Sequence, residues 1–99
     1  MTVELKLTVN DSPIFTDYFV AGFLDHTISG MVESLEGTGE IKHLKYSIDG
    51  EKVTINLNGK EVPINEFVTK IFKSTTYGIL TSLKGVTSPI RKVELEIKK

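Results

Sequence analysis

The 99-residue sequence predicts an α+β fold: a ferredoxin-like βαββαβ sandwich in which two helices cover one face of a four-stranded antiparallel sheet. Three observations carry this prediction. The chain aligns on itself at an offset of 48 residues, each half reads strand, helix, strand, and an Asp-Gly turn joins the two halves. Because single domains commonly contain about 100–150 residues, we expect one domain over 1–99, built from the repeats 1–49 and 50–99.

The internal repeat is gap-free between residues 5–37 and 53–85, where eight of the 33 aligned positions are identical. The identical pairs are Asn10/Asn58, Phe19/Phe67, Val20/Val68, Thr27/Thr75, Gly30/Gly78, Ser34/Ser82, Leu35/Leu83 and Gly37/Gly85. Many other pairs keep their apolar character, as Leu7 and Ile55 do. The repeat is therefore interpreted as a duplicated unit.

The first strand of each repeat alternates apolar and polar residues, in Val3–Val9 and in Val53–Leu57. The second of these strands is followed by Asn58-Gly59, which accepts the positive φ angles of a type I′ turn. The segment Lys60–Ile64 should then run back briefly beside the strand. Asn10-Asp11 occupies the same place in the first half and predicts a similar turn.

One long helix follows in each repeat. Asp17 and Asn65 are aligned and supply the short side-chain oxygens that cap helix N-termini. Gly37 and Gly85 are also aligned and suit the left-handed residue that follows a helix C-terminus. The predicted helices span 18–36 and 66–84.

Two alternating segments flank Asp49-Gly50 between the repeats, a dipeptide typical of two-residue hairpins. The second and third strands should therefore be antiparallel neighbours, and Val93–Ile97 supplies the fourth strand. Right-handed crossovers then favour the strand order 4-1-3-2. The alternative order, 1-2-3-4, keeps the two strands of each repeat adjacent.

A helical wheel gives both helices one sheet-facing arc of about 160°. In the first helix it contains Phe19, Gly30, Phe23, Ser34, Thr27, Val20, Met31, Leu24 and Leu35, and the second helix has the aligned residues there. Small and hydroxyl side chains lie toward the middle of the arc. We expect them to let the helices approach the sheet closely; the alternative is a polar-lined pocket for a small ligand around Thr27 and Thr75.

Val32 and Leu80 fall outside that arc, and Tyr77 lies near Leu80 on the wheel. Two interpretations stay open for these residues. They meet inside the monomer, where a pseudo-twofold axis brings matching flanks together, or they form an exposed ridge that buries itself against a second copy in a homodimer.

Composition excludes several classes of protein. Twelve Lys and Arg against thirteen Asp and Glu argue against a polybasic binder of nucleic acid or membranes. The absence of Cys removes disulfides, thiolate metal sites and cysteine nucleophiles. The start of the chain alternates rather than forming a signal-peptide core, and no apolar run approaches the roughly 18–20 residues of a membrane span. We expect a cytoplasmic protein without membrane contact.

No catalytic, cofactor or metal site is visible in the sequence. His26 and His43 have no second ligand at metal-binding spacing, and no phosphate-binding glycine motif or catalytic triad is present. Glu94 and Glu96 share one strand face, but they alternate with apolar residues and are expected on a solvated, charge-mixed surface. We therefore expect no enzyme.

The leading hypothesis is a small non-enzymatic module that binds or assembles with protein, including a second copy of itself. The first alternative is a regulatory domain for a small molecule, ACT-like in topology only, with ligand-binding residues Asn10, Asp11, Ser12, Thr27 and Thr75. The second alternative is weak nucleic-acid binding through Lys42, His43, Lys45, Arg91 and Lys92.

Overall fold

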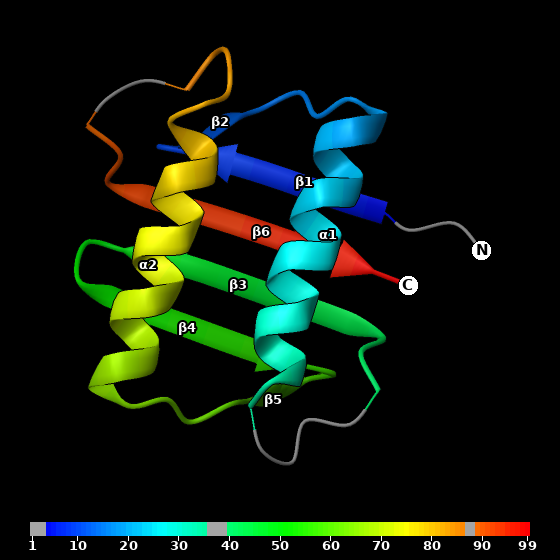
Figure 1. Cartoon of the computed structure of the whole chain (residues 1–99), viewed down its shortest axis with the longest axis vertical. Helices are drawn as coiled ribbons and strands as arrows, with labels where there is room; N and C mark the ends of the chain where they lie inside the picture. Colours follow the sequence, from blue (N-terminus) through cyan, green and yellow to red (C-terminus); the bar gives the residue numbers. More distant parts are fainter. Residues whose placement is uncertain (1–3, 36–39, 87–88) are drawn as a thin grey trace.

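The computed structural model describes residues 4–35, 40–86 and 89–99, which form one antiparallel sheet covered on one face by two helices (Figure 1). The strands are β1 (Glu4–Val9), β2 (Ser12–Pro13), β3 (His43–Asp49), β4 (Lys52–Leu57), β5 (Lys60–Glu61) and β6 (Lys92–Lys98), and the helices are α1 (Tyr18–Glu33) and α2 (Glu66–Leu80). The fold is therefore α+β. The helices lie side by side, run in opposite directions and cross over the strands rather than following them (Figure 1).

The strands lie in the order β2-β1-β6-β3-β4-β5, and every neighbouring pair is antiparallel. The predicted ferredoxin-like sandwich is wrong, because the sheet has six strands rather than four and its centre is formed by β6 and β3. Neither predicted order, 4-1-3-2 or 1-2-3-4, places the last strand of the chain between the first two long strands.

The short strands β2 and β5 explain this order. Each follows a two-residue turn and runs back beside the preceding strand, so that Ser12 pairs with Val9 and Lys60 pairs with Leu57. A strand that holds a return segment on one side has only its other side free for a long neighbour. This puts β1 and β4 toward the edges of the sheet. The central places fall to β3 and β6, which pair along all seven residues of each strand.

The predicted hairpin and the two asparagine turns are confirmed, but the hairpin turn consists of Gly50 and Glu51, because Asp49 pairs with Lys52 in the sheet. β3 and β4 form an antiparallel hairpin, and Gly50 after β3 has a positive φ of 61°. Asn58 and Gly59 have φ angles of 52° and 87°, and the aligned Asn10 and Asp11 have 50° and 65°. Asn, Asp and Gly tolerate these left-handed values, which two-residue hairpin turns require.

The predicted helix N-caps are also confirmed. The Asp17 carboxylate accepts a hydrogen bond of 2.8 Å from the Val20 amide. The Asn65 side-chain oxygen accepts one of 2.9 Å from the Val68 amide. Both caps satisfy one of the free N–H groups that every helix start exposes.

The helices end earlier than the predicted residues 36 and 84, at Glu33 and Leu80. Serine hydroxyls supply part of the reason, because Ser34 Oγ donates to the Met31 carbonyl and Ser82 Oγ donates to the Gly78 carbonyl. Gly85 is left-handed as predicted, with φ of 86°, but it belongs to the loop beyond α2 rather than to the helix end. The predicted cap at Gly37 lies outside the described residues.

Equivalent elements of the two halves occupy equivalent places. The bounds of β1 and β4 differ by 48 residues, as do those of β2 and β5, and the bounds of β3 and β6 differ by 49. Exchanging the halves reproduces the strand order read backwards, which is the topology of a pseudo-twofold axis between β6 and β3. Two copies of one unit would produce this arrangement, and the duplication itself stays a prediction.

The side that each helix turns to the sheet overlaps the predicted arc only at one flank, where Leu24 and Phe72 are buried as expected. The buried residues are Leu24, Asp25, Ile28, Ser29 and Val32 in α1 and Phe72, Thr76 and Leu80 in α2. Phe19, Phe23, Gly30 and Ser34 were expected to face the sheet, yet all four are exposed. At 100° per residue the buried arc is displaced by roughly 120° from the predicted one. The sequence of α1 is apolar on nearly every side, so hydrophobicity did not select one.

A single hydrophobic cluster drawn from both halves fills the space between helices and sheet. Near its centre the rings of Tyr46 and Phe72 meet edge to face, with centroids 5.7 Å apart. The Tyr46 hydroxyl donates to the Phe72 carbonyl at 3.1 Å and lies 2.8 Å from Thr76 Oγ1. Burial raises the pKa of Tyr46 to about 12, because the ionised phenolate would lose its hydration.

Neither helix among the described residues is long and apolar enough to cross a membrane.

Candidate functional site

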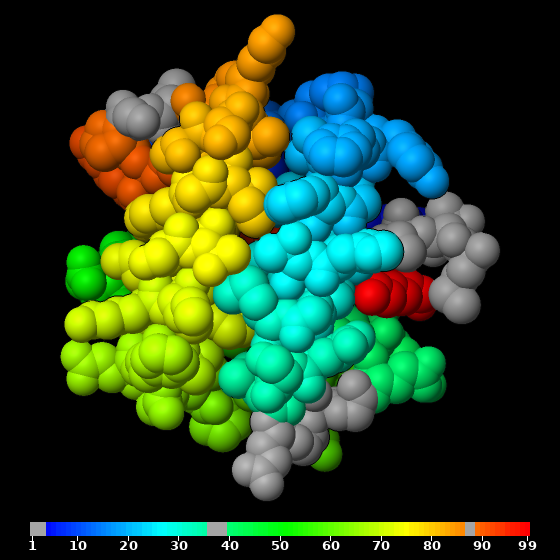
Figure 2. All heavy atoms as spheres, viewed as in Figure 1, coloured from blue at the N-terminus to red at the C-terminus, as the bar shows by residue number. Residues whose placement is uncertain are grey.

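The most unusual surface of the protein is the side of the helix layer that is turned away from the sheet, because large apolar side chains are exposed there (Figure 2). We call it the outer helix face and define it by four residues from each half: Phe19, Phe23 and Gly30 of α1 with Ser34 just after it, and the aligned Phe67, Ile71 and Gly78 of α2 with Ser82 just after it. On a wheel of 100° per residue these positions lie together, opposite the buried residues of each helix. All eight are exposed.

Large apolar side chains on this face are open to solvent to an unusual degree. Phe19 and Phe67 are 73% and 70% exposed, and Phe23 and Ile71 are 49% and 45% exposed. The Phe19 and Phe23 rings lie one helical turn apart, with centroids 6.0 Å apart, and therefore form a continuous aromatic surface. Scattered single apolar residues are normal on protein surfaces, whereas a contiguous patch marks an interaction site.

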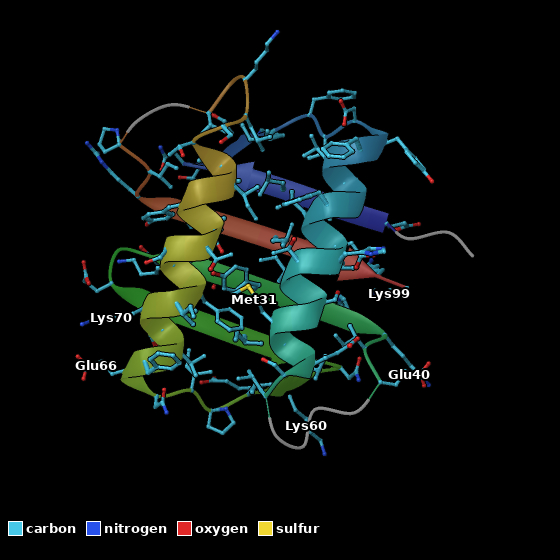
Figure 3. The ribbon with its side chains drawn as sticks, viewed as in Figure 1. Met31, Glu40, Lys60, Glu66, Lys70 and Lys99 are labelled. Atoms are coloured by element: carbon cyan, nitrogen blue, oxygen red, sulfur yellow. The ribbon has the colours of Figure 1, made fainter. Side chains whose placement is uncertain are left out.

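A groove of about 440 Å³ runs between the C-terminal half of α1 and the N-terminal half of α2. It is lined by Met31, Ser34, Leu35, Phe67, Val68, Ile71, Phe72 and Thr75. Met31 lies between the two helices in Figure 3 and helps to form the floor of this groove. The groove opens onto the outer helix face, because Ser34, Phe67 and Ile71 belong to both.

Gly30 and Gly78 do not serve the purpose that the sequence suggested. They were expected to bring the helices close to the sheet, but both are exposed, and a Cβ atom added to either would meet nothing within 4 Å. Packing inside the monomer therefore does not require glycine at these positions. A glycine in a helix interior costs about 1 kcal/mol relative to alanine, and both halves of the chain carry it.

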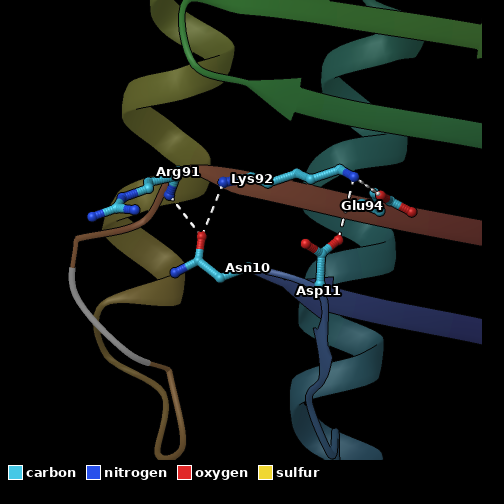
Figure 4. A network of polar contacts seen from close by, with 5 residues as sticks. All are labelled: Asn10, Asp11, Arg91, Lys92 and Glu94. Atoms are coloured by element: carbon cyan, nitrogen blue, oxygen red, sulfur yellow. Dashed lines mark hydrogen bonds and ion pairs between the residues drawn. The ribbon is translucent and has the colours of Figure 1, made fainter.

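The predicted ligand-binding residue Asn10 holds the chain together at the end of β1 (Figure 4). Its side-chain oxygen accepts hydrogen bonds from the Arg91 and Lys92 amides at 2.8 and 3.0 Å, and its Nδ2 donates to the Pro89 carbonyl. Asp11 contacts the Lys92 ammonium at 3.3 Å, and Ser12 is exposed in β2. The polar groups of Asn10 and Asp11 thus serve contacts between the β1 turn and the start of β6.

Asn58 makes the same contacts in the second half. Its side-chain oxygen accepts from the Lys42 and His43 amides, and its Nδ2 donates to the Glu40 carbonyl. The identity of Asn10 and Asn58 is therefore explained by architecture: Asn10 binds the turn after β1 to the chain that enters β6, and Asn58 binds the turn after β4 to the chain that enters β3.

The other predicted site residues separate into different environments. Thr75 lines the groove, and Thr27 is half-buried on α1. Val32 and Leu80 are fully buried in the core, so neither is available on the surface of the monomer. Tyr77 is half-buried, and the Lys73 ammonium lies 5.8 Å from the centre of its ring, within cation–π distance.

The open face of the sheet, opposite the helices, is polar and internally paired. Glu96 on β6 lies directly between Lys6 on β1 and Lys45 on β3. Opposite charges at paired positions of neighbouring strands stabilise the sheet modestly. Polar side chains continue on both sides of Glu94 in the next row, where its register partners are Thr8 and Ser47. The predicted solvated, charge-mixed surface therefore describes this face.

The basic side chains considered for nucleic acid mostly have acidic neighbours. The Lys92 ammonium lies 3.2 Å from Glu94 and 3.3 Å from Asp11, and its hydrogen bonds to these carboxylates raise the pKa of Lys92. His43 Nε2 lies 2.5 Å from the Glu96 carboxylate, and this hydrogen bond lowers the pKa of Glu96. Phosphate groups would compete with these carboxylates.

Metal chemistry finds no support in the part of the chain that the structure describes, since no group of three His, Asp or Glu residues lies close enough to hold an ion there. His26 is exposed on α1.

One buried polar cluster was missed in the sequence. Asp25 is buried in α1, where its carboxylate accepts a hydrogen bond of 2.9 Å from Ser29 Oγ and lies 3.2 Å from the Lys99 ammonium. The spacing of Asp25 and Ser29 by four residues on one helix side was a readable signal. The contact with Lys99 was not readable, because it joins residues 74 positions apart and depends on β6 lying under α1.

Comparison of the chain with protein-family models, with curated proteins and with solved structures found no match in any of the three.

Proposed function

We propose that this protein is a small non-enzymatic binding or assembly module that acts by protein–protein contact through its outer helix face. The observation that carries the proposal is the exposure of Phe19, Phe23, Phe67 and Ile71 on one side of the helix layer. Aromatic residues are enriched at interaction surfaces because each one buries a large area with little loss of conformational entropy.

The composition of α1 supports this proposal. A helix that is apolar on all sides is ordinarily covered on all sides. The sheet covers only one side of α1, and Asp25, the one Asp or Glu between Tyr18 and Glu33, is already buried with Lys99. The remaining surface of α1 therefore has the composition of a contact surface rather than a solvated one.

A photo-crosslinking amino acid tests the proposal directly. Benzoylphenylalanine in place of Phe23 should form a covalent protein adduct on irradiation in the organism that makes the protein. The matched control places the same group at Lys45, which is exposed on the open sheet face. An adduct from position 23 with none from position 45 supports the proposal. Absence of any protein adduct from position 23 would contradict it.

The groove beside Met31 favours a small-molecule regulatory domain as the second candidate. Its volume of about 440 Å³ lies within the roughly 300–1,000 Å³ of typical ligand pockets, and Thr75 offers a hydroxyl on its wall. A thermal-shift screen with amphipathic metabolites would reveal a ligand. The shift should vanish in Ile71→Lys if the groove holds the ligand, and a shift that survives this change would exclude the groove.

A further inference from the structure

The outer helix face has the geometry of a surface that fits itself, and we infer that its occupant is a second copy of this chain, packed helix layer against helix layer about a twofold axis. This inference rests on the proposed protein-binding function and names the partner.

The described residues that are identical in the two halves are exposed or half-buried. Among the identical pairs whose residues the structure describes, no residue is fully buried. Three pairs lie on the outer helix face: Phe19/Phe67, Gly30/Gly78 and Ser34/Ser82. Core pairs are only similar, as Leu24 and Phe72 are. The outer helix face therefore presents the same chemistry twice, once from each half of the chain.

The four helix ends are the corners of the outer helix face, and aromatic corners alternate with glycine corners around it. Each helix carries its phenylalanine near its N-terminus and its glycine near its C-terminus, and the two helices are antiparallel neighbours (Figure 1). The aromatic end of each helix thus lies beside the small-residue end of the other, as shown by Phe67 and Ser34, which line one groove. Large and small corners then lie on opposite diagonals of the face.

This pattern is self-complementary. A twofold axis in the plane of the face, parallel or perpendicular to the helices, lays each aromatic corner of one copy on a glycine corner of the other. An isologous contact requires this property: a patch must fit the same patch rotated by half a turn. A Cβ atom added at Gly30 or Gly78 would meet nothing within 4 Å. The surface above each glycine therefore has room for the Phe19 or Phe67 ring of a second copy.

The apolar area of the outer helix face suits a weakly associating dimer. At roughly 200 Å² for a fully exposed aromatic side chain, the exposed parts of Phe19, Phe23, Phe67 and Ile71 together offer roughly 450 Å² per copy. Tyr18 is not counted, because on the wheel it lies between the buried Asp25 and Ser29. Two copies would bury roughly 900 Å² of this apolar surface, which is the size of a small, transient interface.

Charge disfavours a nucleic acid or an anionic membrane as the occupant. α1 has no Lys or Arg, and α2 has only Lys70 and Lys73, accompanied by Glu66. None of the eight residues of the outer helix face is charged, so a second copy meets no like charge on this face.

Sedimentation equilibrium over a wide range of protein concentration tests the inference. The wild-type chain should be a dimer that dissociates on dilution. The double variant Gly30→Leu/Gly78→Leu fills the small corners and should raise the dimer Kd by more than about 100-fold, although it adds apolar surface and favours the helix. Non-specific hydrophobic association would instead become stronger in this variant.

Gly22→Leu is the matched control, because Gly22 is another exposed glycine of α1 with an open Cβ position but lies off the outer helix face. It should leave the Kd within about threefold. A second variant exchanges the corners: Phe19→Ala, Phe67→Ala, Gly30→Phe and Gly78→Phe together keep the alternation and should restore the dimer. Circular dichroism verifies that each variant folds.

A wild-type chain that stays monomeric, or a dimer insensitive to Gly30→Leu/Gly78→Leu, overturns the inference. The mass of the adduct from position 23 separates this failure from that of the proposed function. An adduct with a different chain leaves the protein-binding function standing without self-association. Absence of any adduct removes both.

Discussion

The two exposed faces of this thin molecule, whose extents are 35 × 34 × 18 Å, solve the problem of meeting solvent in opposite ways. On the open sheet face Glu96 lies between Lys6 and Lys45, and its carboxylate contacts His43 while Glu94 contacts Lys92. On the outer helix face, large apolar side chains and glycines are exposed to solvent in the monomer. A face whose groups are already paired gains little from contact, whereas an apolar face gains free energy when it is covered. This difference is the basis for proposing the helix layer as the interacting side.

Substitution of Leu80 by glutamate should give the largest effect, since it tests which side of α2 is internal. Leu80 is fully buried, so Leu80→Glu should lower the free energy of unfolding by about 3–5 kcal/mol, through lost packing and an unpaired buried charge. Ile71→Glu on the outer side should change it by less than about 0.5 kcal/mol. Urea unfolding at low protein concentration measures both. Equal losses would mean that the assigned sides of α2 are wrong.

Raising the pH above 10 should lower the stability of the fold, because the buried Tyr46 hydroxyl of β3, which hydrogen-bonds to α2, resists ionisation. The pKa of Tyr46 is raised to about 12 in the folded chain, against about 10 in an unfolded one. The raised pKa of Tyr46 adds roughly 2–3 kcal/mol to the free energy of unfolding below pH 10, and this contribution is lost as the pH rises toward 12.

The control is Tyr46→Phe, which should lose about 1 kcal/mol at neutral pH because its hydrogen bond to Thr76 is missing. The variant should also show a shallower decline than the wild type between pH 10 and 12, measured by urea unfolding. Identical declines would place the Tyr46 hydroxyl in contact with solvent.

Alanine at the outer glycines should stabilise the monomer. Gly30→Ala and Gly78→Ala each remove the helix cost of glycine and meet no neighbour, so each should raise the free energy of unfolding by up to about 1 kcal/mol. Unfolding at concentrations where the chain is monomeric is the measurement. A lower free energy of unfolding would mean that these glycines face the sheet, as the sequence had suggested.

The smallest effect concerns the polar face. His43 is the main cause of the lowered pKa of Glu96, so His43→Gln should move the Glu96 titration, followed by carboxyl ¹³C NMR, toward higher pH. Because the folded-state pKa is lowered, the associated stability is present above the ordinary glutamate pKa and is lost as pH falls through the folded value. For this exposed pair it should amount to at most about 0.5 kcal/mol. An unmoved Glu96 titration would show that the pair does not form in solution.

The residues of the candidate site could be grouped from the sequence, but the sequence placed them against the sheet rather than on the exposed side of the helices. The wheel grouped Phe19, Phe23 and Gly30 correctly, because helix geometry alone decides which residues share a side. It then turned that group toward the sheet, since apolar residues are usually internal. Val32 and Leu80, considered for an interface, are in the core. Asn10 was considered for a ligand, yet it binds backbone amides at the start of β6.

Local chemistry was determined by the sequence itself: the alternation of the strands, the caps at Asp17 and Asn65, the turn at Asn58-Gly59 and the hairpin at Gly50. Each of these depends on residues a few positions apart, so steric preference and short hydrogen bonds suffice. Only the tertiary structure decided the strand order and the side of α1 that is buried. The order depended on which strand edges the return segments β2 and β5 left free, and a helix apolar on all sides has no preferred inward side until the sheet beneath it is assembled.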